Sequence, residues 1–266
     1  ASVNCMTNRT SAKAPSEWVG SIGAGRGASA IISSPARPTA RATRNSRALP
    51  PINPATCAPP QAAATVAETE YMLGIADATP WVLGVVGWVD FEKPSDLAEL
   101  KRLAGHPKFK GVRPMIQDLP DDNWMLREDV QWGFRAICDL GLRFDALGFP
   151  RHLANFLTIL KRYPTMPVVV DHCMKPPIRQ KSDAHFRFWA DGMARIADET
   201  AAVVKFSALI TEADADWTVE DLKPYVEHVF SAFGPERVMW GSDWPVCRLR
   251  GEYADWRAAA LSISQP

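Results

Sequence analysis

The chain has no net charge, few cysteines and no long apolar run, and each of these absences excludes a class of protein. Its 30 basic residues match its 30 acidic residues, which argues against nucleic acid or a membrane as a partner. No apolar stretch approaches the roughly 18 residues that a membrane span requires. The cysteines are odd in number and scattered without metal-site spacing, at positions 5, 57, 138, 173 and 247. We therefore expect reduced thiols and a cytoplasmic protein.

The first 60 residues have few of the side chains from which a core is built. They contain no Phe, Tyr, His or Asp, a single leucine (Leu49), and one acidic residue (Glu17) against seven basic ones. Such a segment cannot bury enough apolar surface to fold. A transit peptide or a solvated tail fits this composition, but our hypothesis is a shifted reading frame or a misassigned start. We expect residues 1–60 to be disordered or frame-shifted, and residues 61–266 to form one barrel domain.

Residues 61–266 alternate short apolar runs with amphipathic segments. Segments 186–198 and 221–233 repeat apolar residues every three or four positions, which predicts helices, and Gly234-Pro235 ends the second one. The apolar runs predict buried parallel strands, because they are continuously apolar and end in polar residues. This alternation predicts an α/β fold with a parallel sheet. The predicted strands are 83–90, 110–116, 142–145, 167–172, 203–207 and the run that begins at Val238.

The run that begins at Val238 ends in the most informative residue, Asp243, which is framed by Gly241, Ser242 and Trp244. In a (β/α) barrel the first polar residue past a strand lies at the edge of the barrel where the chemistry takes place. An aspartate that caps the next helix is the structural alternative. Other predicted strands also end in polar residues, which favours a catalytic carboxylate.

Six motifs taken together resemble one family. They are Gly87-Trp88-Val89-Asp90, Gly111-Val112-Arg113 with Gln117, Asp171-His172 with Lys175-Pro176, Lys205-Phe206-Ser207, Thr211-Glu212-Ala213 and Gly241-Ser242-Asp243-Trp244-Pro245-Val246-Cys247. In this order they resemble the amidohydrolase-superfamily sugar-lactone hydrolases of the L-fuconolactonase and L-rhamnonolactonase type, over about three quarters of the chain. The resemblance implies a (β/α)8 TIM barrel. This chain is expected to lack the first strand, most of the second, and a final helical segment.

The resemblance implies a hydrolase of carbohydrate metabolism whose small-molecule substrate is a sugar-acid lactone. Asp243, at the end of the eighth strand of the family barrel, looks like the general base that activates water. His172, at the end of the sixth, would line the pocket and donate a hydrogen bond to the carbonyl oxygen as negative charge develops. A histidine whose hydrogen bonds are satisfied inside the barrel is the alternative.

Arg113, Gln117 and Lys175 are candidates for substrate binding. The guanidinium of Arg113 could hold a carbonyl or a sugar hydroxyl through its fixed fork of donors. A salt bridge from Arg113 to a nearby acid such as Asp118 is the alternative. Lys175 precedes two prolines and would either reach the substrate or lie on the surface.

Five of the ten tryptophans fall into two groups. Trp88 and Trp244 adjoin polar groups at strand ends, where a flat apolar face could stack on a sugar ring. Trp189, Trp217 and Trp256 lie at helical positions, where packing in the core is the expected role.

The chain departs from the family pattern at the metal site. Members usually carry a His-x-His pair at the end of the first strand, which binds a divalent cation such as zinc in metal-dependent relatives. This chain has no histidine before His106, and His172 and Asp243 supply two ligands at most. We therefore assign no residue to a metal and leave the cofactor open. The alternatives are a metal-dependent hydrolase or decarboxylase of the same superfamily, and an inactive barrel remnant.

Overall fold

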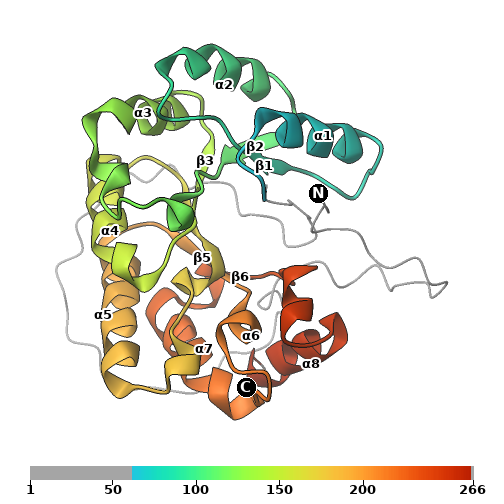
Figure 1. The fold of residues 1–266 in the computed structure, drawn as a ribbon, viewed down its shortest axis with the longest axis vertical. Helices are drawn as coiled ribbons and strands as arrows, with labels where there is room; N and C mark the ends of the chain where they lie inside the picture. Colours follow the sequence, from blue (N-terminus) through green and yellow to red (C-terminus); the bar gives the residue numbers. More distant parts are fainter. Residues whose placement is uncertain (1–61, 265–266) are drawn as a thin grey trace.

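A computed structural model describes residues 62–264, and the hypotheses about residues 1–60 lie outside this range. Six strands form one parallel sheet in which each strand pairs with the next along the chain (Figure 1). The predicted α/β fold is therefore confirmed, and each of the six predicted strands overlaps an observed one. The strands are β1 (Val85–Gly87), β2 (Phe109–Val112), β3 (Arg143–Ala146), β4 (Val168–Val170), β5 (Val203–Phe206) and β6 (Val238–Trp240).

Helices alternate with the strands and lie around the sheet (Figure 1). The two predicted helices are confirmed as α5 and α7, and α7 ends at Phe233, just before Gly234, whose φ is +73°. Helix α1 was not predicted, because its apolar residues do not gather on one face. No helix in the described range has the length and apolar character needed to cross a bilayer. The helices are α1 (Val66–Asp77), α2 (Leu97–Ala104), α3 (Gln131–Asp139), α4 (Leu153–Arg162), α5 (Asp183–Glu199), α6 (Leu209–Glu212), α7 (Val219–Phe233) and α8 (Tyr253–Ser264).

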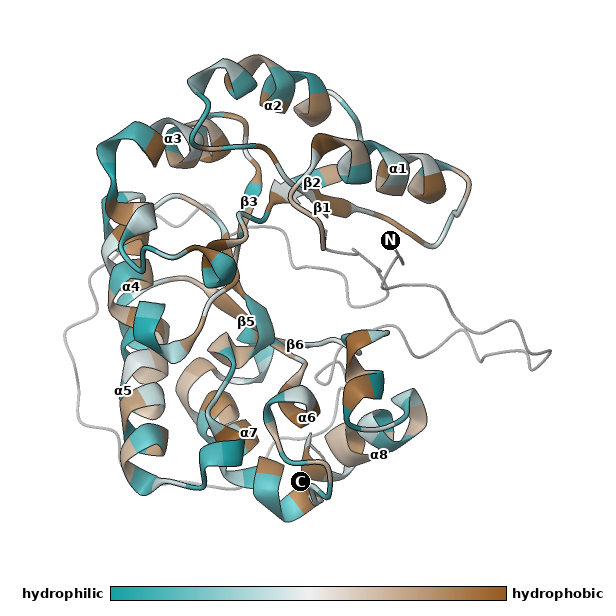
Figure 2. Ribbon diagram, in the orientation of Figure 1, coloured by the Kyte–Doolittle hydropathy of each residue, from teal (hydrophilic) through white to brown (hydrophobic). Residues whose placement is uncertain are grey.

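Aromatic side chains fill the space between the sheet and the helices. Phe144 of β3 meets Phe134 of α3 edge to face, and Phe206 of β5 meets Trp256 of α8 in the same way. Trp189 and Trp256 are fully buried, as expected. In Figure 2 the helices carry both hydrophobic and hydrophilic residues, which is typical of helices with one face on a sheet. Because side chains alternate along a strand, the neighbours of Phe144 and Phe206 point to the opposite, inner face.

The sheet is open within residues 62–264, since no strand there joins β6 to β1. Trp81 and Leu83 precede β1, and Val246 and Leu249 follow β6; all four are exposed apolar side chains. The described part of the fold therefore has two strand edges with apolar surface beside them.

Gly111 lies in β2 at a point where the adjacent strand leaves no room for a side chain. A Cβ atom there would lie 2.5 Å from the backbone oxygen of Arg143 in β3. Because both strands are held in the sheet, we expect Gly111→Ala to lower the free energy of unfolding by on the order of 2 kcal/mol, measured by urea denaturation. Gly74 of α1 is the matched control, since its added Cβ would meet nothing within 4 Å. Gly74→Ala should raise stability by about 0.5 to 1 kcal/mol, and equal losses in both variants would contradict this account.

Candidate active site

The carboxyl ends of β4, β5 and β6 share an uncommon backbone conformation. Non-glycine residues with left-handed φ follow each of these strands: His172 to Lys175 at +49° to +56°, Ala208 at +61° and Asp243 at +54°. Among the described non-glycine residues only Lys181 has a positive φ elsewhere. Each such residue costs on the order of 1 to 3 kcal/mol, and strain of this kind clusters at functional sites. No glycine or asparagine marks these positions, so the sequence carried no signal for them.

This edge brings the two predicted catalytic residues together. His172 Nε2 lies 3.8 Å from Asp243 Oδ1, and the two side chains are 10% and 7% exposed. Burial lowers the pKa of His172 to about 3, so the imidazole is neutral at physiological pH. Burial, followed by the negative charge of Asp171, raises the pKa of Asp243 to about 7. A neutral imidazole therefore faces a carboxyl group that titrates near neutral pH, as general acid–base chemistry requires.

The left-handed turn that carries His172 is held from two neighbouring elements. Trp189 of α5 donates its indole N–H to the backbone oxygen of Cys173 at 2.8 Å. Ser207, directly after β5, places its Oγ 2.8 Å from His172 Nδ1. Burial raises the pKa of Cys173 to about 12, so its thiol stays protonated and does not act as a nucleophile. Ser207 belongs to the Lys205-Phe206-Ser207 motif, but the sequence predicted no role for it.

Three buried charged side chains and one partly buried lysine, here called the charge quartet, lie next to the pair: Arg113, Asp145, Asp171 and Lys205. Arg113 Nη1 lies 3.0 Å from Asp171 Oδ2, Lys205 Nζ lies 3.2 Å from Asp145 Oδ2, and Lys205 also pairs with Asp171. Burial disfavours the charge on Asp171, but Lys205, His172 and Arg113 outweigh it and hold its pKa well below the usual range. Asp145, Asp171 and Lys205 had no predicted role. The available signal was a charged residue inside an apolar strand, as in Val203-Val204-Lys205-Phe206.

Arg113 and Gln117 each leave one buried polar atom without a hydrogen bond. The ion pair of Arg113 is with Asp171 rather than with Asp118, and the side-chain amide of Gln117 contacts Asp118 instead, at 3.2 Å. Arg113 Nε and Gln117 Oε1 find no partner among residues 62–264. Both side chains therefore keep some capacity to bind a ligand.

The remaining three candidates follow different strands: Lys175 follows β4, Trp244 follows β6 and Trp88 follows β1. The positive charge of Lys175 acts on Asp243, opposing the rise in its pKa, and its ammonium lies 5.1 Å from the Phe149 ring centroid. Trp244 is half-buried beside Asp243, after β6. Trp88 is half-buried after β1, at the other end of the sheet order, and within the described range it makes no hydrogen bond to the pair.

The described residues do not fit a catalytic zinc site. Among them, no three His, Cys, Asp or Glu side chains converge to hold a metal ion. His172 Nδ1 already bonds to Ser207, and Asp171 is engaged by two cations. A catalytic zinc needs three protein ligands and an open position, whereas His172 Nε2 and Asp243 offer two. We therefore derive no chemical step through a metal.

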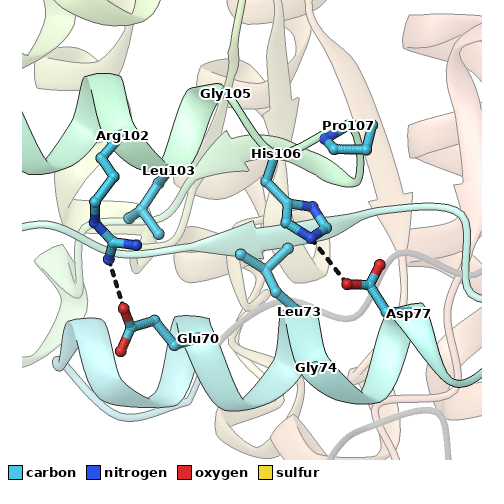
Figure 3. A pocket seen from close by; sticks show the side chains of 9 residues that line it. All are labelled: Glu70, Leu73, Gly74, Asp77, Arg102, Leu103, Gly105, His106 and Pro107. Atoms are coloured by element: carbon cyan, nitrogen blue, oxygen red, sulfur yellow. Dashed lines mark hydrogen bonds and ion pairs between the residues drawn. The ribbon is translucent and has the colours of Figure 1, made fainter.

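A hollow of about 460 Å³ lies away from this site, between α1 and the end of α2 (Figure 3). Arg102 pairs with Glu70 across it, and His106 Nε2 lies 3.1 Å from Asp77 Oδ2. These contacts tie α2 and the loop after it to α1. Because exposed pairs of this kind contribute little and no strand end reaches the hollow, we assign it no chemistry.

A family model described as Amidohydrolase matches residues 29–265. The chain belongs to the amidohydrolase family. This amidohydrolase is 41% identical to L-fucono-1,5-lactonase of Burkholderia ambifaria over 74% of its own length and 67% of that protein. It is 29% identical to L-fucono-1,5-lactonase of Burkholderia multivorans, over 77% of this chain and 74% of that protein. The chain thus spans two thirds to three quarters of these relatives, and the resemblance inferred from the motifs is confirmed.

Solved structures confirm the barrel-type fold. An amidohydrolase from Burkholderia multivorans with bound HEPES superimposes with a TM-score of 0.74 at 29% identity, covering 79% of this chain and 76% of that one. The structure of a Burkholderia multivorans amidohydrolase with bound zinc gives the same TM-score of 0.74 and identity of 29%, covering 79% and 75%. A probable 2-pyrone-4,6-dicarboxylic acid hydrolase from Acinetobacter baumannii, 19% identical over 73% of this chain and 71% of that one, shares the fold with a TM-score of 0.60.

Replacing Lys205 tests whether the stability of the protein depends on pairing the buried carboxyls of the charge quartet with a cation. Lys205→Met leaves two buried carboxyls without their shared cation, so we expect unfolding at pH 7 to become easier by about 3 to 5 kcal/mol. Burial already raises the pKa of Asp145, and without Lys205 the folded-state pKa values of both carboxyls should lie above the unfolded value, so the loss should shrink as pH falls from 7 to 5. Urea denaturation at both values measures this. The exposed Lys101→Met is the matched control and should change stability by less than about 0.5 kcal/mol. A pH-independent loss would argue against the quartet.

Proposed function

We propose that this amidohydrolase opens a sugar-acid lactone by general-base activation of water. The observation that carries the proposal is the pairing of Asp243, whose pKa is about 7, with the neutral imidazole of His172 at 3.8 Å. Similarity to two L-fucono-1,5-lactonases supports the substrate class. The same similarity supports a small-molecule substrate.

In the proposed reaction Asp243 takes a proton from water while the water oxygen bonds to the lactone carbonyl carbon. The carbonyl oxygen becomes an oxyanion and accepts a hydrogen bond from His172 Nε2–H. The carbonyl then re-forms, the bond to the ring oxygen breaks, and Asp243 returns the proton to that oxygen. The product is a hydroxy acid, which ionises in solution. A positioned base of this kind contributes about 10² to 10⁴ in rate.

The remaining candidates are proposed to bind the sugar. Arg113 and Gln117 offer the buried unpartnered atoms Nε and Oε1 for substrate hydroxyls or the carbonyl. The positive charge of Lys175 favours both the ionised form of Asp243 and a developing oxyanion. Trp88 and Trp244 are proposed to stack on the sugar ring and exclude water.

A metal-dependent hydrolase is the second candidate, because the structure of a 29% identical amidohydrolase contains zinc. It requires at least one ligand beyond His172 and Asp243, and the described residues supply none. Metal analysis of the purified protein, together with turnover before and after chelation, separates the two candidates.

The pH profile of turnover tests Asp243 as the base. The base must be ionised, so kcat/KM for L-fucono-1,5-lactone should rise with pH through about 7 and level off above it. His172, with a pKa of about 3, is neutral throughout this range and adds no second limb. A pH-stat assay corrected for spontaneous lactone opening measures the profile. A flat profile from pH 5.5 to 8.5 would rule out a base of this pKa.

Asp243→Asn should separate activity from stability. We expect kcat to fall by about 10² or more, since the base is lost. The raised pKa means that ionised Asp243 opposes folding above pH 7 and ceases to do so near pH 4. At pH 8 the variant should therefore have a higher melting temperature than wild type and a free energy of unfolding larger by at most about 4 kcal/mol, and at pH 4 the two proteins should be similarly stable.

Asp216→Asn is the matched control for this change, because Asp216 is exposed. It should alter neither turnover nor melting temperature. Activity of Asp243→Asn equal to that of wild type would overturn the assigned mechanism. Equal turnover would favour the metal-dependent alternative, and equal absence of turnover would favour the inactive one.

A further inference from the structure

We infer that Ser207 is a positioning residue that selects the tautomer of His172. The inference rests on the proposed function, because donation to a developing oxyanion requires a proton on His172 Nε2. Ser207 Oγ lies 2.8 Å from His172 Nδ1, and the two residues are 1% and 8% exposed. Water is therefore largely excluded from this contact, and the hydroxyl is the side-chain partner of Nδ1 in the described range.

The two ring nitrogens of His172 face different groups, so the two neutral tautomers differ in free energy. A neutral imidazole carries one N–H, on either Nδ1 or Nε2. Nε2 faces Asp243 Oδ1 at 3.8 Å. A lone pair on Nε2 would face the carboxylate unfavourably, whereas an N–H there is attracted to it. The proton therefore belongs on Nε2, and Nδ1 must accept a hydrogen bond.

Only a donor can satisfy Nδ1 in that tautomer, and a serine hydroxyl can donate. The described contacts offer the Ser207 hydroxyl no other side-chain partner than His172. Its O–H is thus free to point at Nδ1. The serine and the carboxylate act at opposite ends of the ring and favour the same tautomer.

The strand ends on either side of Ser207 hold it in this position. Gly241, which follows β6, leaves room for it, because a Cβ atom at Gly241 would lie 3.0 Å from Ser207 Cβ. On the other side, the left-handed turn fixes the imidazole, and Trp189 binds the backbone of that turn. The contact therefore joins two parts of the rigid sheet edge, and neither partner belongs to a free loop.

Histidine-selective ¹⁵N NMR of the full chain reads the tautomer directly, without any substrate. In wild type at pH 7.5, His172 should show a bare Nδ1 and a protonated Nε2. His228 is an internal reference, since its Nε2 lies 2.8 Å from the backbone oxygen of Ala190 and must donate to it. The signal of His172 is assigned by its loss in His172→Gln.

Ser207→Ala should shift the His172 signals toward the Nδ1-protonated form or a mixture, and leave those of His228 unchanged. With L-fucono-1,5-lactone as substrate, kcat should fall by about tenfold or more while KM changes less than about threefold, because the lost interaction belongs to the transition state. Ser207→Thr keeps the hydroxyl and should restore both the tautomer and most of kcat. A merely structural role for Ser207 would change stability but not this tautomer signature.

The outcomes distinguish this inference from the proposed function. If Ser207→Ala leaves the His172 tautomer as in wild type, or if wild type already carries its proton on Nδ1, the inference is overturned, whether or not the protein opens lactones. If the tautomer changes as expected but wild type opens no lactone, the positioning role stands and the proposed function fails. Should Ser207→Thr fold poorly, the spectra of wild type and Ser207→Ala still decide the matter.

Discussion

The neutralisation of buried charge on the inner face of the sheet is the constraint on which the rest of the site depends. Arg113 follows β2, Asp145 belongs to β3, Asp171 follows β4 and Lys205 belongs to β5, so the quartet joins four consecutive strands. Removing each charge from water costs several kcal/mol, and only mutual pairing offsets it. The ion pairs thereby fix the strand ends relative to one another. A site built from residues of flexible loops would not be held in this way.

The same constraint gives different pKa values to two aspartates, Asp171 and Asp243, that lie at the same edge of the sheet. Asp171 is surrounded by cations and stays ionised, whereas Asp243 is buried with weaker compensation and feels the negative charge of Asp171. One carboxylate is therefore a permanent charge and the other is a titrating group. Environments that push the pKa values of neighbouring acids apart are a general way to obtain one structural and one reactive carboxyl group.

Local patterns in the sequence predicted the six strands and two of the helices, because periodicity is a short-range property. Asp243 and His172 were singled out by their positions at strand ends and by the family resemblance, and their catalytic roles stay predictions. The quartet escaped prediction because its partners lie 34 to 60 residues apart and meet only when neighbouring strands align. Ser207 escaped for the same reason, since its partner is 35 residues away. The left-handed turn had no local signal, because the cost of its backbone is balanced by contacts from α5 and β5.

The left-handed turn after β4 has a fixed length. The N–H of Lys175 bonds to the backbone oxygen of His172 at 2.8 Å, so the turn closes after three residues. With about three residues per turn, side chains three positions apart project in the same direction. The imidazole of His172 and the ammonium of Lys175 therefore emerge on one side of the chain. Residues 173 and 174 are buried and separate the two side chains, so only other residues that can be buried would fit there. Insertion or deletion of one residue would turn the ammonium of Lys175 away from the imidazole.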